Sequence, residues 1–307
     1  MYGETIHKIR KSKNMTLKEV AGHSLSVSQL SRFENGKSMI PVDLFYEVLE
    51  NLNVTTAEFE YINGQEKTDQ LFELLTRVEK YNNHNETENL KELISEIEDV
   101  HPSPYSWEQF IIYFIESILE THDLRGSGWE EFENRTMKTQ QPVLDYLMQV
   151  DDWGEMELRL YAIFGFVLNV ETTHFLMRTA LKKSKQYLEI PATKNLLSVI
   201  LSNNFSTFLF NDRLDFAEET IELFEKKYAE DMETIIPHID FIFNKGLLAY
   251  KKNMPEEGKM YCEKAISTCR LFKQKGYEKR LTKRYKSWKE KYTDPEFKEL
   301  MIKFGGI

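Results

Sequence analysis

The chain contains few residues that interrupt helices or form covalent cross-links. Its 307 residues include only 8 prolines, 13 glycines and 2 cysteines, and no apolar run is long enough, at about 18 residues, to span a membrane. Scarce proline and glycine favour helices, and two cysteines exclude a disulfide framework or a cysteine-rich metal site. The N-terminus has no apolar segment typical of a signal peptide. We therefore expect a cytoplasmic protein with reduced thiols and no membrane contact.

Sequence motifs of common enzyme sites are also missing. The sequence has no phosphate-binding loop ending in Lys-Ser/Thr, no His-Glu-x-x-His and no Gly-x-Ser-x-Gly, and its 7 histidines are scattered. We expect no enzymatic activity, no cofactor, no catalytic residues and no metal ligands.

Charge is distributed unevenly between the two ends of the chain. The net charge is −10, yet residues 1–38 contain seven Lys or Arg against three Glu and carry +4, which leaves −14 on the rest. Binding to phosphate depends on local positive charge, so a small basic head on an acidic body is compatible with DNA binding.

The first 62 residues have the pattern of five short helices. Thr16 and Glu19 form a capping-box pattern that opens the second helix. The third helix begins near Ser26 and ends before Gly36, a residue suited to the left-handed position after a helix. A polar linker follows at 63–67, so we predict a first domain at 1–66 and a second at 67–307.

The third helix has the composition of a DNA recognition helix. Its polar face offers glutamine for an adenine edge and arginine for a guanine edge, whereas hydroxyl and lysine side chains near the turns suit phosphates. Alone, such residues would fit an ordinary solvated helix face; with the capping box and the following turn they predict binding to double-stranded DNA. The base-contact candidates are Ser26, Ser28, Gln29 and Arg32, and the phosphate-contact candidates are Thr16, Lys18, Lys37 and Ser38.

The remaining chain predicts an all-α repeat domain. Amphipathic segments follow one another with short loops, the longest irregular stretch being 122–138. One internal repeat aligns the segment from Asn203 to Ala217 with that from Asn244 to Gly258, at an offset of 41 residues. The second of these resembles a tetratricopeptide repeat. We expect a right-handed superhelix of about five degenerate tetratricopeptide-like helix pairs with a concave surface.

Residues 16–21 and 29–37 together resemble the lambda-repressor-like, or XRE-type, helix-turn-helix. In that family an arginine of the first helix pairs with the glutamate before the Asn-Gly turn, positions held here by Arg10 and Glu34. The domain organisation of the whole chain, together with the sequence segments 28–34 and 152–158, resembles the Rgg/MutR branch of peptide-responsive regulators. This resemblance implies a homodimer whose concave repeat surface binds a short, hydrophobic signalling peptide.

The resemblance also suggests which residues hold the peptide, because relatives use repeat asparagines for this purpose. Side-chain amides suit the unpaired backbone groups of an extended peptide, but asparagines near helix crossings also bond to neighbouring backbone, and aromatic residues at helical spacing often belong to the core. The peptide-binding candidates are Asn169, Asn203, Asn204, Phe243, Asn244 and Tyr250.

Three interpretations remain open for the basic stretch 270–291, which carries a net +8: a solvated face, packing against acidic surface or a second subunit, and a second DNA contact. Two alternatives to a peptide-controlled regulator also remain. One is a repressor whose repeat domain serves only dimerisation or a protein partner, and the other is a peptide-binding scaffold or antirepressor.

Overall fold

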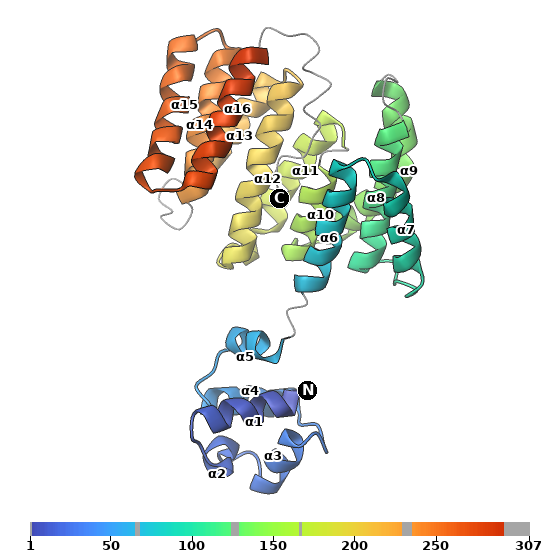
Figure 1. Cartoon of the computed structure of the whole chain (residues 1–307), viewed down its shortest axis with the longest axis vertical. Coiled ribbons are helices and arrows are strands. Elements are labelled where there is room, and N and C mark those ends of the chain that lie inside the picture. The colour runs from blue at the N-terminus through green and yellow to red at the C-terminus, as the bar shows by residue number, and fades with distance from the viewer. Residues whose placement is uncertain (1, 65–67, 124–128, 166–167, 229–234, 292–307) are drawn as a thin grey trace. The chain divides into compact units, whose positions relative to one another are not determined.

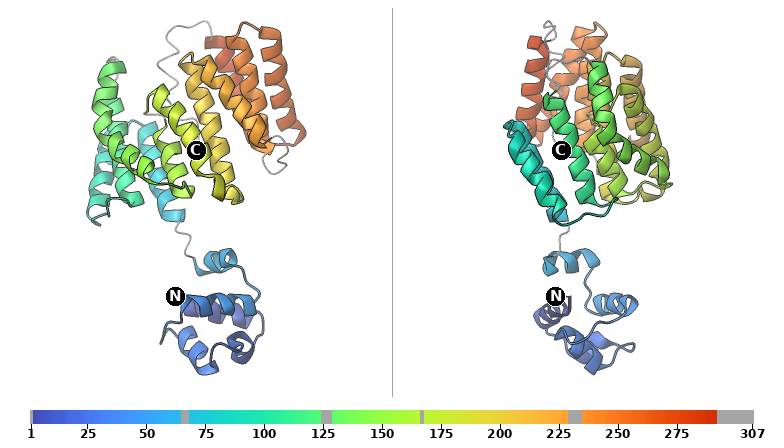
Figure 2. Two further views of the ribbon diagram at one scale, coloured as in Figure 1. Left: turned by 180° about the vertical axis from the view of Figure 1, so that it is seen from behind. Right: turned by 90° about the vertical axis from the view of Figure 1, so that its right-hand side faces the viewer.

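A computed structural model describes residues 2–64, 68–123, 129–165, 168–228 and 235–291. The chain divides into two compact units, Met1–Lys80 and Tyr81–Ile307, and each is described by itself (Figures 1 and 2). The described residues form helices and no strand, as the all-α prediction required. None of their helices is long and apolar enough to cross a membrane.

The N-terminal unit contains the five helices that the sequence predicted. Capping boxes start three of them, with the hydroxyls of Thr16, Ser26 and Thr55 accepting from the backbone N–H three residues on. Gly36 has a φ of 68° and ends the third helix in the left-handed region, as predicted. The helices are α1 (Tyr2–Ser12), α2 (Leu17–Ala21), α3 (Val27–Glu34), α4 (Val42–Asn51) and α5 (Thr56–Asn63).

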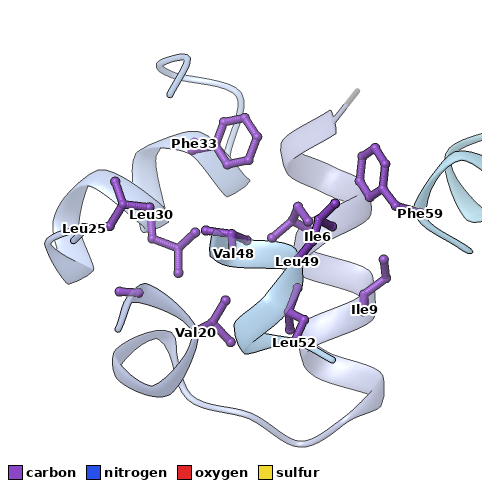
Figure 3. Close-up of a cluster of buried hydrophobic side chains, with 11 residues drawn as sticks. Ile6, Ile9, Val20, Leu25, Leu30, Phe33, Val48, Leu49, Leu52 and Phe59 are labelled. Atoms are coloured by element: carbon purple, nitrogen blue, oxygen red, sulfur yellow. The ribbon is translucent and has the colours of Figure 1, made fainter. Parts of the chain in front are cut away.

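All five of these helices contribute to one hydrophobic core (Figure 3). Ile6, Leu30 and Leu52, from α1, α3 and the end of α4, are fully buried. Because Leu30 and Phe33 fix one face of α3 against this core, the opposite face of α3 is left to the solvent.

Helical hairpins build the second unit. Sequence neighbours pack together, as α14 does with α15, and so do alternate helices such as α12 and α14, which is the contact pattern of stacked repeats. The helix α6 (Thr68–Asn83) spans the boundary between the units. The others are α7 (Thr87–Glu98), α8 (Trp107–Asp123), α9 (Trp129–Gln149), α10 (Glu155–Phe164), α11 (Val170–Lys183), η1 (Lys185–Tyr187), α12 (Pro191–Phe210), α13 (Leu214–Tyr228), α14 (Ile235–Lys251), α15 (Pro255–Leu271) and α16 (Lys275–Lys291).

One predicted irregular stretch is wrong. The sequence suggested 122–138 as a loop, but α9 already begins at Trp129, directly after residues 124–128, which lie outside the described part of the chain. The glutamates and other good helix formers after Trp129 explain the early start, because straight-chain side chains lose little freedom in a helix.

Helices α14 and α15 cross closely. A Cβ on Gly246 would lie 2.6 Å from Cys262 Sγ and 2.8 Å from the backbone oxygen of Gly258. A Cβ on Gly258 would lie 2.9 Å from the oxygen of Gly246. The two glycines therefore allow the backbones to approach more closely than any larger residue would permit.

The segment 152–158, one of those that resemble the Rgg/MutR branch, connects three helices of the second unit. Trp153 is fully buried, its indole N–H donates to the Leu147 carbonyl over 3.0 Å, and its backbone N–H donates to the Lys183 carbonyl over 3.0 Å. Glu157 accepts from the Gly154 N–H at 2.8 Å and from the Tyr146 hydroxyl at 2.6 Å. These bonds connect α9, α10 and α11, so the segment has a structural role.

Candidate DNA-binding and peptide-binding sites

The polar face of α3 is accessible. Leu30 and Phe33 are buried, whereas Ser28, Gln29 and Arg32 are exposed on the other side of the helix. The other predicted DNA contacts, Thr16, Lys18, Ser26 and Lys37, are exposed as well, and Ser38 is half-buried. The structure thus places all eight candidates on the N-terminal unit with their side chains at least partly accessible.

Three of these candidates already have structural roles, Thr16 as the cap of α2 and Ser26 with Gln29 as the capping box of α3. Gln29 Oε1 accepts from the Ser26 N–H over 2.9 Å while Ser26 Oγ accepts from the Gln29 N–H over 3.1 Å. Bidentate recognition of adenine requires both the oxygen and the nitrogen of a glutamine amide. In this conformation Gln29 Oε1 already accepts one hydrogen bond, whereas its two N–H donors suit an acceptor such as a guanine edge or a phosphate.

Arg10 and Glu34 hold α1 against the end of α3. Arg10 Nε and Nη2 each lie 2.6 Å from a carboxylate oxygen of Glu34, and His7 Nδ1 lies 2.8 Å from Oε2. Burial opposes ionisation of Glu34, but the hydrogen bonds and charges of Arg10 and His7 outweigh it and hold the pKa of Glu34 below its ordinary value. The pairing expected from the XRE resemblance is present and is structural.

Among the repeat asparagines, two are committed to the fold. Asn169 caps α11, its Oδ1 accepting from the Thr172 N–H over 2.7 Å. Asn204 is buried, and its Nδ2 donates over 2.6 Å to the hydroxyl of Tyr161, which in turn donates to the Thr173 carbonyl over 2.6 Å. Burial, opposed only in part by the Asn204 hydrogen bond, raises the pKa of Tyr161.

The other two asparagines are Asn203 on α12 and Asn244 on α14, and the second lies where α12 packs against α14. Asn203 is half-buried on α12. Asn244 is fully buried, with its Nδ2 at 3.5 Å from Ser202 Oγ and its Oδ1 lacking a hydrogen-bond partner. A buried acceptor without a partner costs free energy, so Asn244 has capacity for a further donor.

The predicted aromatic candidates belong to the contact between α14 and α16. Phe243 is fully buried and lies against Tyr285, with ring centroids 6.5 Å apart. Tyr250 is half-buried and its hydroxyl is 2.8 Å from that of Tyr285. The structure thus places Phe243 in the core, which is the alternative that helical spacing had left open.

One partly buried cation was missed by the sequence interpretation, which treated 270–291 as a single basic stretch. Arg284 Nη2 donates to Ser206 Oγ over 2.9 Å, so it reaches from α16 to α12. A signal was available: Leu281, Tyr285 and Trp288 are buried at helical spacing, and residue 284 falls on the same side of α16.

These features define the class of protein. A helix-turn-helix with an exposed polar third helix, followed by stacked helical hairpins, is the architecture of transcription regulators that join a DNA-binding head to a helical repeat domain. Residues 6–59 match the helix-turn-helix family model, and residues 109–283 match the model of the HTH-type transcriptional regulator Rgg, C-terminal domain. Since the second match covers more than half of the chain, the protein belongs to the Rgg family of transcriptional regulators.

Solved structures share this fold over nearly the whole chain. The SHP pheromone receptor Rgg2 of Streptococcus dysgalactiae is 22% identical with a TM-score of 0.70, covering 94% of this chain and 99% of that one. A Listeria monocytogenes EGD-e protein assigned as a transcriptional regulator is 20% identical with a TM-score of 0.77, covering 95% and 98%. PrgX in complex with cCF10 is 14% identical with a TM-score of 0.67, covering 92% and 97%.

Proposed function

We propose that the protein acts in the cytoplasm as a homodimer, reads a two-fold-related operator through α3, and is controlled by a short hydrophobic peptide bound to its repeat unit. The observation that carries the DNA-binding part is the exposed polar face of α3, fixed by its buried Leu30 and Phe33. The peptide part is supported by the similar structures, one described as a pheromone receptor and one solved with cCF10.

One α3 helix offers few base contacts. Ser26, Ser28, Gln29 and Arg32 form the set on its exposed side, with Thr16, Lys18, Lys37 and Ser38 available to phosphates. A specific site needs more contacts than one such set provides, so two copies at fixed spacing would read two half-sites.

Asn203 and Asn244 are the strongest candidates for contacts with the peptide backbone. Asn244 lies at the contact of α12 with α14, Asn203 is half-buried on α12, and neither is committed in the way that Asn169 and Asn204 are. An amide can donate to a peptide carbonyl and accept from a peptide N–H at the same time, which matches the alternating groups of an extended chain. Tyr250 is half-buried and would contribute ring surface.

Selection of DNA from a pool of random duplexes by the intact protein tests the proposal. We expect the selected duplexes to share a motif with two related halves. Peptides that the protein retains from a random octapeptide pool should then change the protein's affinity for this motif or its footprint on it. A motif that no peptide affects would favour a repeat unit that serves only dimerisation or a protein partner. Peptide retention without any DNA motif would favour a peptide-binding scaffold or antirepressor.

A further inference from the structure

Arg284 differs from Arg270 and Arg280 in forming no ion pair with a carboxylate of the described residues, although the charge of Asp240 acts on it from a distance. Its Nη2 donates to Ser206 Oγ, and its guanidinium carbon lies 5.3 Å from the centroid of the Phe243 ring. Among the described residues, no carboxylate forms a hydrogen bond or an ion pair with it. Burial lowers the pKa of this guanidinium, which indicates a charge that is poorly solvated.

Two other arginines in this part of the chain are each paired with a carboxylate. Arg280, one turn earlier on α16, lies 3.4 Å from Asp240, and Arg270 lies 2.9 Å from Glu278. Asp240 also accepts from the Tyr277 hydroxyl, so this acid on α14 is already engaged. An arginine side chain has five N–H donors, and the contact with Ser206 uses one of those on Arg284.

Ser206, the hydrogen-bond partner of Arg284, is flanked on α12 by groups suited to a peptide end. Ser202 and Ser206 lie one turn apart on α12, and Ser202 is the neighbour of the Asn244 amide whose oxygen has no partner. On the far side of Ser206, Phe210 of α12 packs against Trp288 of α16, with ring centroids 5.8 Å apart. Thus the contacts of α12 with α14 and α16 include a cation, two hydroxyls, an amide oxygen without a hydrogen-bond partner and an aromatic pair.

We infer that Arg284 binds a carboxylate of the regulatory peptide, an inference that rests on the proposed peptide-binding function. A partly buried guanidinium pairs with a carboxylate through two parallel hydrogen bonds, and such bonds are stronger than neutral ones. The Ser206 hydroxyl accepts from Arg284 and donates to the Ser202 carbonyl over 3.1 Å, and it can exchange that backbone bond for one to the same carboxylate. The carboxylate is either the peptide's C-terminus or an acidic side chain.

Two random octapeptide pools distinguish these sources: one with a free C-terminal carboxylate and one with a C-terminal amide. The intact protein is incubated with each pool, and retained peptides are sequenced. If the C-terminus is the ligand, the free-acid pool is retained at least about tenfold better than the amide pool, as expected for a charge-assisted pair. If a side chain is the ligand, both pools yield peptides enriched in Asp or Glu.

Arg284→Met is expected to abolish the preference for carboxylate, and Arg280→Gln, which changes a nearby arginine already paired with Asp240, is expected to keep it. Arg284→Lys keeps the positive charge but lacks the planar guanidinium that binds a carboxylate through two hydrogen bonds, so it should reduce the preference. This variant replaces Arg284→Met in the test if the Met variant does not fold. Peptides retained by wild type without any preference for carboxylate would overturn the inference while leaving peptide binding intact. Failure of wild type to retain any peptide would remove both proposals.

Discussion

Arg10 and Glu34 form a bidentate ion pair in the core of the DNA-binding head, with both nitrogen–oxygen distances at 2.6 Å. Their side chains are only 6% and 2% exposed, and Arg10 Nη1 also donates to the Met15 carbonyl over 3.0 Å. The pair therefore joins α1, the turn before α2 and the end of α3. The position of the recognition helix depends on this connection.

Arg10→Met is expected to destabilise the head by about 3–5 kcal/mol, because it leaves the Glu34 carboxylate buried without its main partner. Hydrogen exchange of the α1 and α3 amides in the intact protein measures the loss. Lys11→Met, at an exposed position next to it, is the control and should change stability by less than about 0.5 kcal/mol. Equal protection of α1 and α3 in both variants would show that the ion pair is not needed.

Stability of the head should fall in acid because of Glu34. Its pKa lies below the ordinary value of 4.5, so the folded state favours the ionised carboxyl. The resulting stabilisation is present above that ordinary value and is lost as the pH falls through the lowered pKa of the folded state. The protection factors of α3 amides, which correct for the pH dependence of intrinsic exchange, should fall in wild type as the pH is lowered across this range. The Glu34→Gln variant, already weaker, should show a smaller dependence on pH; an identical pH dependence would exclude Glu34 as the cause.

The adjacent residues Asn203 and Asn204 form a matched pair for separating peptide binding from folding. Asn204→Ala should lower the free energy of unfolding by about 1–3 kcal/mol, because it leaves the buried Tyr161 hydroxyl without its donor. Asn203→Ala, at a half-buried position, should leave stability nearly unchanged and weaken retention of peptides. Unfolding in urea and peptide retention are the two measurements. If Asn203→Ala binds peptides as wild type does, its assignment to the peptide site is wrong.

The crossing of α14 and α15 predicts a cost for one added methyl group. Gly246→Ala would place a Cβ 2.6 Å from Cys262 Sγ and 2.8 Å from backbone, so about 1–3 kcal/mol of stability should be lost. Gly276→Ala, near the start of α16, meets nothing within 4 Å and should be neutral or slightly stabilising. Thermal unfolding of the two variants compares them directly, and similar midpoints would contradict the close crossing.

Much of the local structure could be predicted because its causes lie within a few residues of sequence. The Thr16–Glu19 capping box and the left-handed Gly36 appear where expected. The polar contacts of the repeat unit could not be predicted in this way. Asn204 meets Tyr161 from 43 residues away, and Arg284 meets Ser206 from 78. Helical spacing indicates which face of a helix is buried, but it does not indicate which polar groups on two buried faces come together.

The central claim is that α3 reads DNA, and Arg32→Ala tests it most directly. Arg32 is exposed and lies on the side of α3 opposite the buried Leu30 and Phe33, so its loss should not alter folding. The measurement is the affinity of the intact protein for the selected duplex relative to a scrambled duplex, at one fixed salt concentration. Each lost bidentate contact to guanine costs about 1–3 kcal/mol, so the variant should lose its preference for the selected duplex while its thermal midpoint stays that of wild type. An unchanged preference in Arg32→Ala would contradict the account.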